Sequence, residues 1–129
     1  MNQNSTTGLD QFLGIRQRVV TADKVILEWE VQPEHLQPYG IVHGGMYCTA
    51  VESAASIGAA TWLGDRGNVV GVSNHTDFLR GVGTGSMTAT ASPIHRGRSS
   101  QLWLVEVRDE QARLVARGQV RLQNLTPQS

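Results

Sequence analysis

The stretch GGMYCTAVESAASIGAATWLG, residues 44–64, differs in composition from the segments around it. It is rich in Ala, Ser and Gly, shows no alternating apolar pattern, and carries one charged side chain, Glu52. A helix that is uncharged nearly all the way round is expected to be buried, and Gly64 stands where a glycine commonly ends a helix. We therefore predict one long central helix over residues 44–63, with Glu52 near the core.

The segments on either side of this helix have the patterns of strands. Before it, RQRVVTADKVILEWEVQ predicts two strands that turn around residues 21–23, and LDQFLGI predicts a short helix whose cap lies in residues 5–7. After it, four strand-like segments follow between Gly-rich or charged turns: NVVGVSNHTDFL, GSMTATASPI, SQLWLVEVRD and RLVARGQVRLQNL. The order ββ, helix, ββββ predicts the α+β class, with an antiparallel sheet packed on a single helix.

Length and charge limit the classes of protein. The 129 residues predict one domain over 1–129, with polar ends, 1–7 and 126–129, that are expected to fray. Eleven Lys and Arg balance eleven Asp and Glu, so no basic field favours a nucleic-acid partner. Residues 40–64 contain too many polar groups for a membrane span. The single cysteine and an N-terminus without the features of a secretory signal favour a reducing cytoplasm.

Glu52 raises the question of what a lone acid does in such a helix. At about 100° per residue, the face that it occupies is otherwise made of small residues: Gly45, Cys48, Thr49, Ser56 and Ala59. Burial of an unpaired carboxylate costs so much that such a group is usually paired or has a raised pKa. A catalytic base or nucleophile would justify that cost. Alternatively, Glu52 reaches water at the helix edge or pairs with an arginine from the sheet.

The sequence HGG, residues 43–45, lies where the helix is expected to begin. Unpaired backbone N–H groups and the positive end of the helix dipole meet there, and glycines allow another group to approach closely. Such a site suits a carbonyl oxygen that gains negative charge, although two glycines can also simply ease a sharp turn. Together with Glu52, this pattern favours acyl chemistry.

His43 and Glu52 are too far apart to act on one carbonyl carbon within a single chain. Nine positions of helix span about 13 Å at 1.5 Å per residue. Two such helices running antiparallel about a twofold axis would bring the beginning of one beside the middle of the other. The spacing therefore predicts a composite site in a dimer.

The stretch QPYGIVHGGMYCTAVESAAS, residues 37–56, resembles the loop and helix of hotdog-fold acyl-CoA thioesterases, the group that includes hydroxybenzoyl-CoA, phenylacetyl-CoA and dihydroxynaphthoyl-CoA thioesterases. The likeness continues through NVVGVSNHTDFLRG, PIHRGRSSQLW and GQVRL, and so extends from about Phe12 to Leu125. It implies a curved antiparallel sheet wrapped around one long helix. That arrangement agrees with the element order predicted from the residues.

The resemblance also implies roles for particular residues. Glu52 would attack the thioester carbonyl or activate the water that does, and the sequence leaves both routes open. The N–H of Gly44 would stabilise the oxyanion, Gln37 and His43 would shape the same end of the site, and Ser56 would position water or the carboxylate. In the family, Glu52 and the Gly44 end come from opposite subunits.

Coenzyme A would bring phosphates to the surface, where arginines in turns can contact them: Arg80, Arg96 and Arg98. These arginines can equally be solvated. Gly45 would also face the substrate, and Phe78, Met46 and Trp62 are candidates for the acyl pocket, with simple core packing as the alternative. The four histidines show no metal-ligand spacing, so we predict neither metal nor cofactor, coenzyme A being part of the substrate. Cys48 has no evident basic partner and is expected to pack.

The leading prediction is an acyl-CoA, or aroyl-CoA, thioesterase that forms at least a homodimer, with tetramers frequent in the family. One alternative is a hotdog-fold dehydratase or hydratase acting on hydroxyacyl or enoyl thioesters. A second is a noncatalytic acyl-CoA-binding module. The acyl group stays open among aroyl, short-chain and medium-chain esters.

Overall fold

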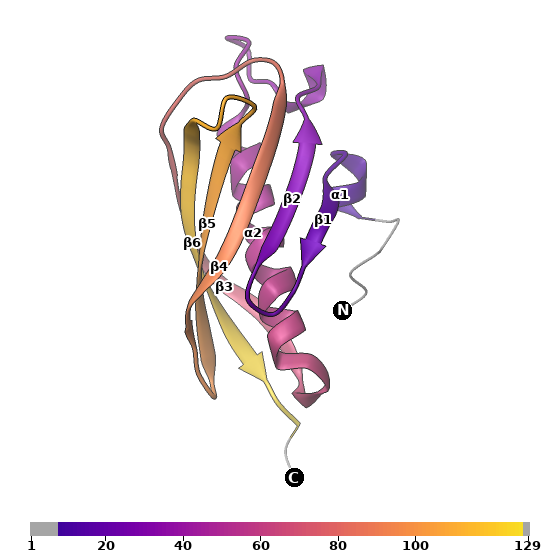
Figure 1. Ribbon diagram of the computed structural model, residues 1–129, viewed down its shortest axis with the longest axis vertical. Coiled ribbons are helices and arrows are strands. Elements are labelled where there is room, and N and C mark those ends of the chain that lie inside the picture. The colour runs from indigo at the N-terminus through magenta and orange to yellow at the C-terminus, as the bar shows by residue number, and fades with distance from the viewer. Residues whose placement is uncertain (1–7, 128–129) are drawn as a thin grey trace.

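The computed structural model describes residues 8–127 (Figure 1). The predicted order of two strands, a long helix and four strands is confirmed, and the elements have these bounds: α1 Leu9–Phe12, β1 Arg16–Val20, β2 Val25–Glu30, α2 Gly44–Leu63, β3 Asn68–Phe78, β4 Ser86–Arg96, β5 Ser100–Asp109 and β6 Leu114–Leu125. Two short 3-10 helices, Pro33–His35 and Gly64–Arg66, precede and follow α2. The cap predicted for α1 lies outside the described residues, and Gly8 occupies the N-cap position.

The six strands form one antiparallel sheet in the order β1-β2-β4-β5-β6-β3. Helix α2 runs along one face of this curved sheet, which wraps around it (Figure 1). The chain therefore has the hotdog fold predicted from the sequence. Strands β1 and β3 form the two edges of the sheet within residues 8–127.

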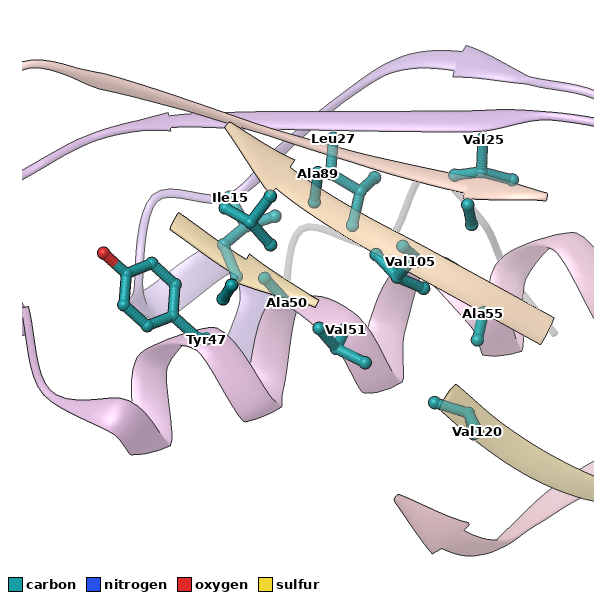
Figure 2. Close-up of a cluster of buried hydrophobic side chains, with 14 of the residues drawn as sticks. Ile15, Val25, Leu27, Tyr47, Ala50, Val51, Ala55, Ala89, Val105 and Val120 are labelled. Carbon is teal, nitrogen blue, oxygen red and sulfur yellow. The ribbon is translucent and has the colours of Figure 1, made fainter. Parts of the chain in front are cut away.

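The core lies between α2 and the sheet, where small helix residues let the two layers approach closely. Figure 2 shows Ala50, Val51 and Ala55 of α2 directed towards buried side chains of the strands, such as Leu27 and Val105. The approach is close at Gly58, where a Cβ would lie 2.6 Å from a ring carbon of Trp103. A larger side chain at this position would separate helix and sheet, which explains the Ala- and Gly-rich composition of the helix.

Strand β3 differs from the other long strands because its side chains are mostly exposed. It pairs with β6 on one side and has no strand partner on the other within residues 8–127. Val70 and Val72 are 44% and 56% exposed. An edge with exposed apolar side chains is a surface on which another strand can pair. In the described part of the chain, no helix combines the length and apolarity needed to cross a bilayer.

Candidate active site

Glu52 lies in the middle of α2, on the side that faces β3. Its Oε1 accepts a hydrogen bond from the amide of Asn74 (3.2 Å), and its Oε2 accepts one from the hydroxyl of Ser56 (3.4 Å). Ser56 therefore contacts the carboxylate one turn away, as the spacing predicted. Gly71 of β3 passes directly over the carboxylate, which a Cβ at that position would overlap. A glycine in this edge strand makes room for the acid.

Glu52, expected near the core, is partly buried, because it lies under an edge strand and not under the centre of the sheet. The pairing with an arginine, considered as an alternative, is wrong for residues 8–127, where none of the ion pairs involves Glu52. The carboxylate is instead held by two neutral donors, which leaves its charge without an ionic partner in this part of the chain.

The beginning of α2 leaves one backbone N–H unused. His43 is the N-cap, and its Nδ1 accepts a hydrogen bond from the N–H of Gly45 (2.8 Å). The N–H of Met46 donates to the carbonyl of His43 (2.9 Å). Among the described residues, the N–H of Gly44 has no hydrogen-bond partner. Gly44, and not Gly45, therefore keeps a free donor at the positive end of the helix dipole.

A cavity of about 340 Å³ opens beside Gly44. Its walls combine apolar side chains with a few polar groups, in the manner of a small-molecule site, and they comprise Gln37, Ile41, Val42, Gly44, Tyr47, Phe78, Leu79, Arg80 and Gly81. The ring of Phe78 covers Gly44, where a Cβ would lie 2.7 Å from it. Four residues selected from the sequence, Gln37, Gly44, Phe78 and Arg80, thus line one cavity. The side-chain oxygen of Gln37 accepts a hydrogen bond from the N–H of Tyr39.

Tyr47 is a wall residue that the sequence reasoning missed. Its side chain is buried, and its hydroxyl has no hydrogen-bond partner among the described residues. Figure 2 shows the hydroxyl pointing away from the labelled aliphatic side chains of the core. Burial, with a smaller contribution from the charge of Asp109, raises the pKa of Tyr47 to about 12. Its position one turn after His43 on a helix that begins at the site was the signal that could have identified it.

Four other predicted residues lie away from this cavity. The Nη1 of Arg96 donates to the carbonyl of Ala22 (2.7 Å) and to Asp23 (2.9 Å), so these bonds hold the side chain at the β1–β2 turn. Trp62, near the end of α2, stacks with Arg66 and Arg96 and does not line the cavity. Met46 is 5% exposed and belongs to the core. Arg98 is exposed in the β4–β5 turn.

The carboxylate of Glu52 and the N–H of Gly44 do not meet within one chain. Eight helix positions separate them, a distance of about 12 Å along the axis. Cys48, on the same helix, is partly buried, and its carbonyl accepts a hydrogen bond from Asn74. Within residues 8–127, no group of three His, Cys, Asp or Glu side chains is placed to hold a metal ion. The site thus consists of two halves, an acid under β3 and a donor beside the cavity.

The fold agrees with comparisons to known proteins. Residues 39–116 match the family described as the thioesterase superfamily, and the chain belongs to it. The Mycobacterium tuberculosis protein named "Putative esterase Rv1847" is 49% identical over 125 residues, which cover 95% of this chain and 89% of that protein. Its structure has a TM-score of 0.90 over 93% of this chain and 98% of that one.

Two further relatives were found. The crystal structure of AziG from S. sahachiroi is 48% identical, with a TM-score of 0.93 over 95% of this chain and 100% of that one. The 1,4-dihydroxy-2-naphthoyl-CoA hydrolase of Listeria monocytogenes is 36% identical over 108 residues, 84% of this chain and 88% of that protein. The similarity therefore extends over nearly the whole length of each relative.

Proposed function

We propose that this protein is an acyl-CoA thioesterase whose sites are each built from Glu52 of one subunit and Gly44 of another. The strongest support is that one helix carries both a carboxylate without an ionic partner and an N–H without an acceptor, as seen within residues 8–127. Membership of the thioesterase superfamily and the relative that hydrolyses a naphthoyl-CoA thioester agree with this activity.

Hydrolysis needs an attacking oxygen and a donor for the oxygen that becomes negative. In one route, Glu52 takes a proton from water while the water oxygen bonds to the thioester carbon, and the carbonyl oxygen takes its charge beside the N–H of Gly44. The C–S bond then breaks, and the thiolate of coenzyme A is protonated. In the other route, Glu52 itself bonds to the carbon and expels the thiolate, and water hydrolyses the anhydride. Transfer of ¹⁸O from labelled water into Glu52 in a single turnover would identify the second route.

The open edge of β3 is where a second subunit would complete the site. Antiparallel pairing of two β3 strands about a twofold axis would cover this edge in both copies. Phe78 covers Gly44, and residues 71–74 cover Glu52. For Gly44 to face Glu52 of the other subunit, the twofold axis must cross β3 halfway between Phe78 and residues 71–74. The midpoint lies near His75.

The cavity beside Gly44 is the proposed acyl pocket, because it adjoins the N–H of Gly44, the proposed oxyanion donor. Arg80 on its wall and the exposed Arg98 are the proposed contacts for the phosphates of coenzyme A. Arg96 is omitted from this set because its Nη1 is bound to Asp23 and to the carbonyl of Ala22 at the β1–β2 turn.

A panel of acyl-CoA and aroyl-CoA esters with a thiol reagent tests the activity. We expect the wild-type protein to release coenzyme A, and Glu52→Gln to lose about three orders of magnitude or more in kcat with little change in folding. Thiol release no faster than that of the variant would refute the proposal. Loss of the enoyl absorbance without free thiol would indicate a hydratase, and tight binding without turnover would indicate a binding module.

Mixing two inactive variants tests whether the site is shared. Glu52→Ala removes the acid, and Gly44→Pro removes the N–H. A mixed dimer would have one site that contains both changes and one site that contains neither. Random exchange of equal amounts should therefore restore about a quarter of the wild-type activity. No recovery after subunit exchange, verified by mass spectrometry, would mean that both groups act within one chain.

A further inference from the structure

His35 is a buried histidine in the loop between β2 and α2, and backbone groups from two different segments occupy both of its ring nitrogens. Its exposed fraction is 2%. The N–H of Gln32 donates to Nδ1 (3.0 Å), and Nε2 lies 2.8 Å from the carbonyl of Leu13. Because an amide N–H can only donate, Nδ1 is the acceptor, and the ring proton must be on Nε2, which donates to Leu13. The ring thus fastens the loop to the segment that follows α1.

The backbone of His35 holds the other end of the same loop. Its carbonyl accepts a hydrogen bond from the N–H of His43 (2.8 Å). Between these two residues the loop closes on itself, through a bridge between Leu36 and Val42 and through the N–H of Gln37, which donates to the carbonyl of Ile41 (2.9 Å). The first and last residues of this closed loop, residues 35–43, therefore meet at His35.

The orientation of the Gly44 N–H depends on this connection. That N–H belongs to the peptide between His43 and Gly44. His43 is held in place because its own N–H donates to the carbonyl of His35. A donor for an oxyanion is effective only when it points to the place where the charge develops. We propose that His35 is a positioning residue that aims the Gly44 N–H, and this inference rests on the proposed thioesterase activity. His35 itself does not line the cavity.

If His35 were purely structural, it would stabilise the fold without affecting the chemical step. A matched control for loss of contacts to the N-terminal segment is a second contact, made by α1. The hydroxyl of Ser53 on α2 donates to Asp10 of α1 (2.7 Å). This contact fastens the same N-terminal segment through Asp10 instead of Leu13, and neither of its partners belongs to residues 35–43. Ser53→Ala should therefore loosen α1 while leaving the loop in place.

Three substitutions at His35 separate its contacts. Asn places an amide oxygen where Nδ1 lies and can keep the bond from Gln32, Gln can extend an amide N–H towards Leu13, and Leu keeps neither bond. We expect His35→Leu to lower kcat about 100-fold, the effect of a displacement of roughly 1 Å at a reacting centre. KM should change less than kcat, since Arg80 and Arg98, the proposed phosphate contacts, lie outside residues 35–43. His35→Asn or His35→Gln should recover part of kcat, and Ser53→Ala should keep it within twofold.

Amide hydrogen exchange at His43 tests the inference without using activity. The N–H of His43 should exchange faster in His35→Leu than in the wild type or in Ser53→Ala, and at an intermediate rate in the variant that recovers kcat. Unchanged exchange at His43 in folded His35→Leu would overturn the inference, as would an equal loss of kcat in Ser53→Ala. If the wild type hydrolyses no thioester, the proposed function fails, and the exchange measurement alone decides whether His35 holds the loop. If His35→Leu does not fold, the Asn and Gln variants give the same comparison.

Discussion

Gly44→Pro is the substitution that most directly removes the proposed oxyanion donor. Gly44 is the first residue of α2, a position where proline is well tolerated because its missing N–H has no helical partner. The preceding residue, His43, has φ −64° and ψ 136°, the extended conformation that a following proline requires. The substitution should therefore delete one N–H and leave the helix intact.

The structure also supplies the control and the magnitude. A Cβ at residue 44 meets the ring of Phe78 whether it belongs to proline or to alanine, so Gly44→Ala reproduces this Cβ contact and keeps the N–H. Loss of one oxyanion donor lowers kcat by about 10²–10³, or roughly 2.7–4 kcal/mol. We expect that loss for Gly44→Pro relative to Gly44→Ala, with KM nearly unchanged, in steady-state release of coenzyme A. Equal kcat values for the two folded variants would refute the assignment of Gly44 as the donor.

Four further outcomes are expected. Gly71→Ala should lower kcat about 100-fold by displacing the carboxylate of Glu52 beneath it. The same overlap should lower the unfolding midpoint of Gly71→Ala, and this decrease should be absent when Gly71→Ala is made in a Glu52→Ala background. Tyr47→Phe should leave stability unchanged or raise it by about 1 kcal/mol, because it removes a buried hydroxyl without a partner in residues 8–127; a clear loss would show that the hydroxyl is satisfied. Since the pKa of Tyr47 is raised from 10.0 to about 12, wild-type stability should fall between these pH values, and this fall should be absent in the Phe variant. His75→Cys should form an intersubunit disulfide under oxidation if the twofold axis crosses β3 there, because residues directly opposite in antiparallel strands have Cα atoms about 4.5–5.5 Å apart; Val70→Cys should not.

Asp109 should influence stability at the acid end of the pH range. Burial opposes its ionisation, but hydrogen bonds from the side chain and N–H of Arg113 and from the N–H of Gln111 outweigh burial and lower its pKa below 3.8. The stability that this group contributes is therefore present above pH 3.8 and is lost as the pH falls through its folded-state pKa. Asp109→Asn should be less stable at neutral pH and should lose less stability on acidification, as measured by thermal unfolding. Parallel curves for the two proteins would contradict this.

The fold could be predicted from local patterns wherever those patterns report burial. The helix over Gly44–Leu63 and its end at Gly64 follow from composition, and the strands that face the core follow from alternation. Strand β3 was found without clear alternation, because an edge strand has little buried face. The order of the strands could not be predicted, since it depends on contacts between segments far apart in the sequence.

The same distinction applies to the site. The contact between Glu52 and Ser56 is local and follows from their spacing on one helix. Asn74 and Gly71 come from a different element, although a glycine inside a strand pattern signals close approach by another group. The contacts of Arg96 could not be predicted because its partners, in the β1–β2 turn, are more than 70 residues away in the sequence. Sequence spacing cannot reveal such a partner.

The neutral surroundings of Glu52 have a consequence for the ionic strength of the assay. Added salt weakens interactions between charges, most strongly at exposed sites. The hydrogen-bond donors to Glu52 are a neutral amide and a neutral hydroxyl, so salt has no ion pair to screen between Glu52 and these two groups. By contrast, salt should strongly weaken the attraction between the exposed guanidinium groups of Arg80 and Arg98 and the phosphates of coenzyme A. Increasing salt should therefore reduce the capture of substrate while leaving the turnover of bound substrate almost unchanged.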